Sequence, residues 1–495
     1  MSPSNRIFTA ASAPVLALLM AGCSVGPDYA RPQAPATRAY TAQPLSNLSG
    51  GSGQQLVPGQ NPATDWWTLF ESPALDATMK QALSGNRSLA AATASLAQAQ
   101  EAVNASGGGL YPQASLNAGA GREKYGAQFS GPQVIPAFTY FSIGPSVSYL
   151  FDYTGGQRRA VEQQQALADY SACQLQAAYL SLTGNVARQA LAIASARARI
   201  AATQALLDDD AKNVALVQTA QAAGSATRVD VLSAQSQLAG DETLLPPLRQ
   251  QLNVAQHALS ILAGRAPADW TPPDFDLDGL RLPQTLPLSL PSELAHRRPD
   301  ILAAEAQLHA ATAAVGVATS HLYPQIGLSA SAGPQSTSLS HLFDATNVAW
   351  GLSTGLTAPL FDGGTLRAQR RGSIDAMHAA LADYEQTVLQ SFGQVADVLS
   401  ALDHDAEHLA AQQKALDLAD ASLKLTRESY RAGNVGVLQV LDAERLYQRA
   451  KLGYLDAQSG RYQDTLALFL ALGGDTLQQF NANNDTAAKP LASLK

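Results

Sequence analysis

The sequence is short of charged residues. Asp, Glu, Lys and Arg make up only 15% of its 495 residues, well under the roughly 25% of an average soluble protein. The 40 acidic and 32 basic side chains give a formal net charge of −8, so there is no basic excess to bind a polyanion. This balance argues against nucleic acid as a partner.

Long apolar runs are also missing from most of the chain. Beyond the first two dozen residues we find no stretch that approaches the ~18 to 20 apolar residues of a membrane-spanning helix. This excludes a polytopic helical membrane protein, but it leaves open a chain that enters a membrane through β-strands.

The N-terminus has the features of a secretory signal. Arg6 precedes a short apolar stretch over 7–20, and two small residues then lead directly to Cys23, an arrangement that resembles the lipobox of bacterial lipoproteins. We interpret 1–22 as a signal peptide and Cys23 as the acylated, palmitate-carrying N-terminus of the mature chain. The alternative is an ordinary signal peptide with a coincidental cysteine.

Cysteine is scarce in the rest of the chain. The sequence has two cysteines, and with Cys23 acylated only Cys173 is left, so no intramolecular disulfide is predicted. Cys173 lies in a helical pattern and is expected to be a small buried residue. Ser24, rather than aspartate, follows the lipidation site. By resemblance to lipoprotein sorting rules, this favours the outer membrane.

The chain is an internal duplication. Leu-Tyr-Pro-Gln at 110–113 recurs at 322–325, and Ala-Gly at 223–224 recurs at 432–433. Each copy is predicted to run helix, strand, strand, long helix, turn and shorter helix. We expect an extended lipidated segment over 23–64, a first repeat over 65–264, a linker over 265–297, a second repeat over 298–474 and a C-terminal tail over 475–495.

The longest helix of each repeat follows a heptad pattern. Apolar residues recur every seven positions from Ile374 to Tyr430, and from Tyr179 to Val214 in the first copy. A sustained heptad predicts coiled-coil packing, and a helix of about seventy residues is on the order of 100 Å long. Glycines end both helices, so we predict two antiparallel hairpins with tips near 224 and 433. Shorter helices are expected at about 73–108, 227–263, 299–320 and 436–472.

Four segments alternate apolar with small polar residues and predict strands. Period two with one apolar and one small polar face suits a strand between lipid and a wet lumen; a soluble β-hairpin is the alternative. Four strands cannot close a barrel, because the smallest single-chain barrels have eight, so several chains must contribute. The count alone does not choose three chains over two or four. The strands are expected at about 112–122, 138–151, 324–334 and 346–360.

Short motifs, taken in order, resemble the outer membrane factor family, the TolC and OprM type, and more closely its NodT-like lipoprotein branch. They cover nearly the whole mature chain. They are Gly26-Pro27-Asp28-Tyr29 after Cys23, Asp65-Trp66-Trp67, Arg298-Pro299-Asp300, the two Leu-Tyr-Pro-Gln segments, and Tyr430-Arg431-Ala432-Gly433 leading to Leu441-Asp442-Ala443.

The resemblance implies an α+β membrane protein. In this fold class a homotrimer forms a 12-stranded β-barrel, four strands per chain, continuous with a long α-helical barrel of antiparallel coiled-coil hairpins. It implies a lipid-anchored outer-membrane exit duct that extends into the periplasm and passively conducts small molecules or drugs in a tripartite efflux system. A periplasmic adaptor (membrane fusion) protein and an inner-membrane transporter are the implied partners.

The resemblance also implies a gate at the hairpin tips, at the periplasmic end of the duct. Asp442 matches the aspartate of the family's constriction, and Leu438 matches an apolar ring used in the OprM branch. Asp230 and Tyr430 match a pair that holds the tip closed. Because a symmetric ring repeats each inward side chain, one carboxylate per chain becomes a cluster of negative charge.

This tip departs from the TolC pattern at two positions. Gln439 stands in place of a second aspartate and Val435 in place of the gate arginine, a role that Arg228 could take. For the two tip aspartates, the alternative is a carboxylate favoured by a helix N-terminus. The acidic run at 208–210 is interpreted as a solvated helix face rather than an adaptor contact.

No catalytic group can be assembled from the sequence. His404 and His408 stand four apart on a helix, but nothing supplies the remaining ligands of a metal site. We expect neither an enzyme nor a metal or cofactor. Two other functions remain open: an outer-membrane channel of a type I protein secretion system, and, less favoured, a periplasmic adaptor, which would have one hairpin and no membrane-type strands.

Overall fold

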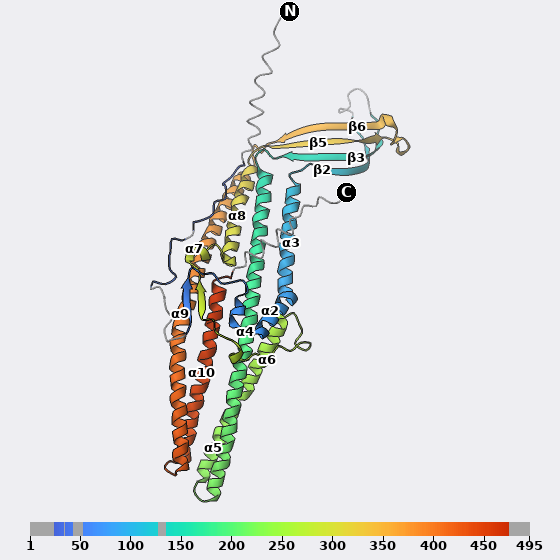
Figure 1. Cartoon of the computed structure of the whole chain (residues 1–495). Helices are drawn as coiled ribbons and strands as arrows, with labels where there is room; N and C mark the ends of the chain where they lie inside the picture. Colours follow the sequence, from blue (N-terminus) through green and yellow to red (C-terminus); the bar gives the residue numbers. More distant parts are fainter. Residues whose placement is uncertain (1–23, 34, 43–52, 127–134, 475–495) are drawn as a thin grey trace, which may run out of the picture. The chain divides into compact units, whose positions relative to one another are not determined.

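The computed structural model describes residues 24–33, 35–42, 53–126 and 135–474, which are mostly helical with few strands (Figure 1). Cys23, the predicted signal peptide over 1–22 and the predicted tail over 475–495 lie outside the described residues. The chain divides into two compact units. The first comprises 1–32, 95–171 and 303–384, and the second comprises 33–94, 172–302 and 385–495. Each unit takes segments from both halves of the chain, so this division cuts across the predicted repeats.

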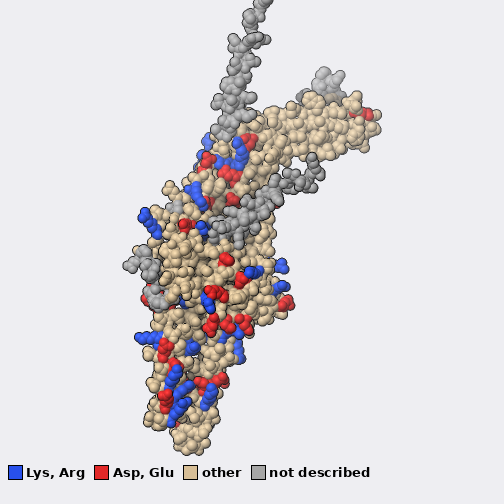
Figure 2. All heavy atoms as spheres, viewed as in Figure 1, with Lys and Arg blue, Asp and Glu red and all other residues tan. Residues whose placement is uncertain are grey.

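The first unit contains a four-stranded antiparallel sheet. Its order is β2 (Gln113–Glu123), β3 (Phe138–Phe151), β5 (Gln325–Ser336) and β6 (Val348–Thr357). Within these strands, charge occurs only at Arg122 and Glu123. Figure 2 shows the same feature as a tan surface over the strands, whereas charged side chains gather over the helices.

The two faces of this sheet differ in chemistry. Ser115 lies opposite Ser146, and Ser329 opposite Ser353, with hydroxyl oxygens 2.8 and 2.7 Å apart. Glycines occupy much of the rest of this face. The other face carries large apolar side chains that are exposed in the single chain, since successive residues of a strand point to opposite sides. These exposed side chains include Leu116, Leu328, Trp350, Leu352 and Leu356.

The two longest helices begin in the same way, each shortly after a Phe-Asp pair, at 151–152 and at 361–362. The Asp152 carboxylate accepts hydrogen bonds from two backbone N–H groups at the start of α4 (Gly156–Ala222), at 3.1 and 3.0 Å. Asp362 accepts two, each 2.8 Å long, at the start of α9 (Thr365–Arg431). Each carboxylate thus satisfies N–H groups that have no partner within the helix. Both helices contribute residues to both units.

The segment that follows Cys23 is fastened within the first unit. The Val25 N–H donates to the Thr154 carbonyl over 2.9 Å, and Arg159 forms an ion pair with Asp28. The Tyr29 ring stacks on His309 with 4.2 Å between centroids, and its hydroxyl donates to Glu305 over 3.1 Å. These contacts hold residues 25–29 next to the end of β3 and the start of α4.

The helix α8 (Pro299–Ser320) corrects one expectation. By length and composition alone it could cross a membrane, with a mean hydropathy of 1.3, yet half of that stretch is buried inside the structure. No such run was expected beyond the first two dozen residues, because alanine rather than larger residues supplies much of the apolar character of this helix. A helix apolar on all sides is typical of a protein core.

The core of the second unit is built around aromatic side chains. Trp66 and Phe70 of η2 (Trp66–Phe70) pack on Phe469 of α10 (Val437–Ala471), with 5.4 Å between the stacked Trp66 and Phe469 rings. Trp67 is buried beside them. The Tyr462 hydroxyl donates to the Leu280 carbonyl over 2.6 Å, which holds part of the linker on α10.

A short parallel sheet joins two segments that the sequence analysis left without regular structure. In the second unit β1 (Gln55–Pro58) pairs with β4 (Thr285–Leu288). Each strand has only four residues, and its partner lies about half the chain away in the sequence. No local sequence pattern therefore predicts the pairing. The linker also contains two short helical turns. They are η3 (Leu277–Gly279) and α7 (Pro291–Leu294).

Two further short helical turns lie between β5 and β6. They are η4 (Leu339–His341) and η5 (Ala345–Asn347).

Two expected helical segments, 73–108 and 227–263, each divide into two helices. The first divides at Asn86 into α2 (Pro73–Gly85) and α3 (Arg87–Gly108); the Asn86 carboxamide accepts from the Leu89 N–H and donates to the Leu262 carbonyl, each over 2.9 Å. The second divides into α5 (Arg228–Glu242) and α6 (Leu245–Leu262), where two prolines enter the first turn of α6. Proline has no backbone N–H, so it cannot donate the next intrahelical hydrogen bond that would continue α5.

Candidate functional site

Both hairpins turn through a glycine in the left-handed region. Gly224 has φ of 78° and Gly433 has φ of 75°, values that glycine adopts without a steric penalty. The following N–H groups reach back to the helix, from Ser225 to the Ala220 carbonyl and from Asn434 to the Ser429 carbonyl, both over 2.9 Å. Matching geometry at both tips accounts for the recurring Ala-Gly.

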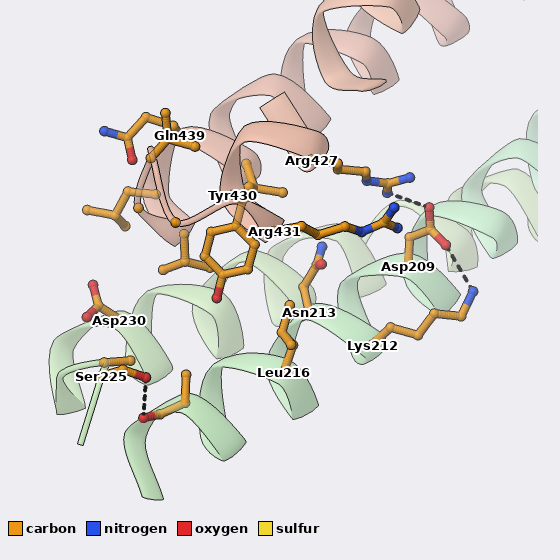
Figure 3. Close-up of a pocket in the computed structure, with 18 residues that line it drawn as sticks. Asp209, Lys212, Asn213, Leu216, Ser225, Asp230, Arg427, Tyr430, Arg431 and Gln439 are labelled. Carbon is orange, nitrogen blue, oxygen red and sulfur yellow. Dashed lines mark hydrogen bonds and ion pairs between the residues drawn. The ribbon is translucent and has the colours of Figure 1, made fainter. Parts of the chain in front are cut away.

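A cavity of about 1050 Å³ lies between the two tips, lined by residues of both hairpins (Figure 3). Asp230, Tyr430 and Leu438, three of the predicted gate residues, contribute to its wall, as do Val435 and Gln439. The Tyr430 ring points from α9 toward the first hairpin. The structure therefore brings three of the four predicted gate residues together.

Asp442 is not among the residues that line this cavity. It lies on α10, four positions after Leu438, with its side chain 72% exposed and its carboxylate 3.4 Å from Arg445. In a single chain its charge therefore faces solvent, and among the described residues Arg445 is the one cation that pairs with it.

Asp230 bonds to its own helix terminus. Its carboxylate accepts from the Thr227 N–H and hydroxyl, both over 2.7 Å, while the Thr227 hydroxyl accepts from the Asp230 N–H over 3.2 Å. This capping box holds the pKa of Asp230 below its usual value. The hydrogen bond from the Thr227 backbone N–H has the largest effect, and the one from the Thr227 hydroxyl comes next. Across the described residues no hydrogen bond joins Asp230 to Tyr430. The helix-terminus alternative thus accounts for the contacts of Asp230 in this structure.

Arg427 links the two hairpins, a contact that the sequence analysis missed. From α9 its guanidinium lies 2.9 Å from Asp209 of α4 and 2.7 Å from Glu444 of α10. Asn213 of α4 also donates to Glu444. Burial works to raise the pKa of Asp209, but hydrogen bonds from Arg427 and Lys212 outweigh it and hold that pKa below its usual value. At Glu444, which is 5% exposed, burial prevails and raises the pKa.

Asp210 corrects the interpretation of the acidic run as a solvated face. It is 2% exposed, and one of its carboxylate oxygens has no partner within the described residues. Burial, followed by the neighbouring Asp241 carboxyl, raises the pKa of Asp210 to about 7. Two carboxylates this close cannot both ionise readily, so the pair holds a proton near neutral pH. Asp208, by contrast, is exposed as expected.

Other residues singled out from the sequence lie apart from this cavity. His404 lies 3.9 Å from Glu407 on an exposed face of α9, and the described residues contain no cluster of three or more candidate metal ligands. Cys173 is half-buried in α4 rather than fully buried.

Comparison with known proteins places the chain among outer-membrane proteins. The family model described as outer membrane efflux protein matches it over 78–265 and again over 290–474. The pyoverdine export outer membrane protein OpmQ of Pseudomonas aeruginosa is 34% identical over 85% of this chain and 90% of its own length. The probable outer membrane lipoprotein SilC of Salmonella typhimurium is 28% identical over 92% of this chain and 96% of its own length.

A solved structure has the same fold. That of the outer-membrane channel OprN superposes with a TM-score of 0.84 at 29% identity and covers 91% of this chain and 99% of its own.

Proposed function

This chain belongs to the outer membrane efflux protein family, and from that premise we propose that it forms the passive exit duct of a tripartite efflux system. It is an outer-membrane efflux protein, and its relatives are channels rather than enzymes. In the proposed duct, a periplasmic adaptor and an inner-membrane transporter deliver small molecules to its periplasmic end. Cys23 carries the lipid anchor of the mature chain.

The observation that carries this proposal is the two-faced sheet. One face holds serine and glycine and the other holds exposed leucine and tryptophan, the distribution expected between a wet lumen and lipid. Four strands per chain leave the sheet open at β2 and β6. Closure requires further copies, since no sheet edge can remain unpaired in hydrocarbon. In the proposed homotrimer, three copies supply the twelve strands of one barrel.

The proposed gate lies at the hairpin tips. Leu438 and Tyr430 line the cavity between the hairpins, and the exposed Asp442 is free to form a ring of negative charge in an assembly. The ion pair of Arg427 with Asp209 joins the two hairpins of one chain, and in the proposed gate it helps to hold the tips closed. Asp230 acts here by fixing the first tip through its capping box.

A conductance measurement tests the proposal. The mature lipidated protein, purified in detergent and added to planar bilayers, should insert as an oligomer and give discrete, low-conductance steps. Deletion of its gene should increase the sensitivity of the source bacterium to at least one small-molecule toxin, and reintroduction should restore resistance. Loss of a secreted protein, with unchanged toxin sensitivity, would instead indicate the protein secretion channel. A water-soluble monomer without conductance would contradict both.

A further inference from the structure

The polar face of the sheet changes its chemistry at the end opposite to the start of α4. Along most of this face the side chains are mainly serine, glycine and amides. At the far end of β2 and β3, however, Gly121 pairs with Tyr140 and Glu123 pairs with Phe138. Within the four strands, no other carboxylate or aromatic ring lies on this face.

The register assigns these side chains to the polar face. Successive strand residues point to opposite sides, so Glu123 shares the face of Ser115, and Tyr140 shares the face of Ser146. Arg122 belongs to the opposite, apolar face. The aromatic belt of a membrane barrel faces lipid, so a belt does not account for aromatic rings on the polar face.

The aromatic rings and the carboxylate lie close together. The ring centroid of Tyr125, just after β2, is 6.0 Å from that of Phe138, and the Tyr125 hydroxyl donates to the Glu123 carboxylate over 3.1 Å. The Tyr140 ring lies over Gly121, because a Cβ added to this glycine would be 2.6 Å from ring carbons and from the hydroxyl oxygen. Glycine at 121 therefore leaves room for the ring on this face.

These four side chains, Glu123, Tyr125, Phe138 and Tyr140, are here called the end cluster. The Glu123 side chain is exposed, and among the described residues the one hydrogen bond of its carboxylate joins the Tyr125 hydroxyl. Its negative charge is therefore accessible to a solute. An aromatic ring attracts a cation to its face, and a neighbouring carboxylate adds the attraction of opposite charge.

We propose that the end cluster binds organic cations that carry apolar groups, such as quaternary ammonium compounds, at the outer mouth of the duct. The apolar groups contact the rings, and the positive charge lies near the Glu123 carboxylate. This rests on the proposed function and deepens it, because it names a class of solute that the duct holds.

The position of the end cluster follows from the opposite end of β3. There the Val25 N–H bonds to the Thr154 carbonyl, which places the proposed lipid anchor at Cys23 near that end. From Phe151 to Thr139 the strand is about 40 Å long, or roughly 30 Å across the membrane at the roughly 40° tilt of barrel strands. This matches the ~30 Å hydrocarbon thickness of a bilayer, so the end cluster lies at the outer boundary.

The proposed assembly multiplies the end cluster. Each copy brings the same carboxylate and the same rings to one rim, so they surround a single opening. Because this rim lies at the exit, it does not choose the cargo that enters the duct. It holds organic cations that leave the duct or approach it from outside.

Block of single channels by benzyltrimethylammonium tests this site in the full-length protein. In planar bilayers the compound should reduce the potassium chloride current of the unchanged protein. Glu123→Gln removes the charge and Tyr140→Ser removes a ring, so each should raise the half-blocking concentration at least about fivefold. Tyr140→Phe keeps the ring and should keep the block. Arg122→Gln, the matched control on the apolar face, should stay within about twofold of the unchanged protein, since salt screens its charge.

The outcomes separate this site from the duct itself. An unchanged half-blocking concentration in Glu123→Gln or in Tyr140→Ser overturns the end cluster as the site. Block that Asp442→Ala abolishes and Glu123→Gln leaves intact places the cation at the hairpin tips, which also overturns it. Channels that conduct but are not blocked overturn the site and leave the duct intact. A protein without conductance overturns the proposed duct.

Discussion

At the scale of single residues, charge at the tips determines how the proposed gate should respond. Asp442 is exposed, and its one nearby cation is Arg445 at 3.4 Å within the described residues. Asp442→Ala should therefore raise single-channel conductance and weaken block by multivalent cations in planar bilayers. Asp442→Asn should weaken the block with less effect on conductance, because it removes the charge but keeps the size.

A control for Asp442 is available on α9. Asp420→Ala removes the same charge from a helix surface where it pairs with Lys424, and should leave conductance and cation block unchanged. If Asp442→Ala behaves like this control, Asp442 has no part in a constriction.

Arg427 should matter for how firmly the two hairpin tips are held together. Arg427→Ala leaves the buried Glu444 without its cation and separates α9 from Asp209. An uncompensated buried acceptor costs about 1–3 kcal/mol, so thermal unfolding should begin at a lower temperature and channels should open more often. Arg431→Ala, at the same cavity, is the comparison and should have a smaller effect on both. Equal effects would mean that the cavity wall, not the inter-hairpin ion pairs, holds the tips.

Asp210 gives a prediction about pH. Its pKa is raised from 3.8 to about 7 by burial and by Asp241, with Glu444 and Asp209 adding negative charge. A raised carboxyl pKa favours the protonated folded state, so this contribution to stability is complete below about pH 4 and is lost as pH rises toward 7. Asp210→Asn should remove this loss and raise the melting temperature at pH 8 by a few degrees relative to the unchanged protein.

Asp208→Asn is the matched control for this pH effect, because Asp208 is exposed in the same acidic run. Its stability difference from the unchanged protein should be flat between pH 4 and 8. A similarly flat difference for Asp210→Asn would contradict a shared proton at Asp210.

At the scale of elements, the glycines of the tips can be tested free of steric complications. A Cβ at Gly224 or Gly433 would meet nothing within 4 Å, so substitution acts through the positive φ alone. Gly224→Ala and Gly433→Ala should each destabilise the protein by about 1–2 kcal/mol in chemical unfolding. Gly240→Ala, inside α5 and also in open space, should be stabilising by roughly 0.5–1 kcal/mol. Identical signs at the three positions would rule out this account.

Local patterns predicted some elements and missed others for physical reasons. Seven-residue periodicity and turn glycines are properties of contiguous sequence. The helices α4 and α9 and the two hairpin tips could therefore be predicted from the sequence alone. The β1·β4 pair could not, because four-residue strands far apart carry no periodic signal. The break at Asn86 depends on a hydrogen bond to Leu262, and the burial of Asp210 depends on the packing of α5. Tertiary contacts decide both.

The same division applies within the candidate site. Asp230, Tyr430 and Leu438 were found by matching motifs, and they do line one cavity. Arg427 and Glu444 were missed because the contacts of Arg427 with Glu444 and Asp209 join three helices, and neither residue belongs to a recognised motif. Glu444 is buried on α10 together with the apolar Leu441 and Ala443. The apolar residues around it in the sequence could have suggested a buried acid, but its partner could not be identified without the fold.

At the scale of the whole molecule, the orientation of the sheet toward lipid should be detectable by placing a charge on either face. Val147 lies on the apolar face and Ser146, its neighbour, on the polar face. Val147→Lys should reduce the yield of assembled protein in the outer membrane, since a lysine at the bilayer midplane costs about 2–4 kcal/mol. Ser146→Lys should assemble normally and shift ion selectivity toward anions. The reverse result would exchange the lumen and lipid faces.

The serine and glycine wall has a consequence for what passes along it. In the proposed duct, hydroxyl and peptide groups offer a solute hydrogen bonds comparable to those of water. Over 113–121 of β2 and along β3, β5 and β6, the wall carries no fixed charge that would trap or repel a charged solute. Throughput then depends on the dimensions of the bore and on the concentration driven into it. A conduit of this kind can be shared by inner-membrane pumps of different specificity, because recognition has already taken place before the cargo enters it.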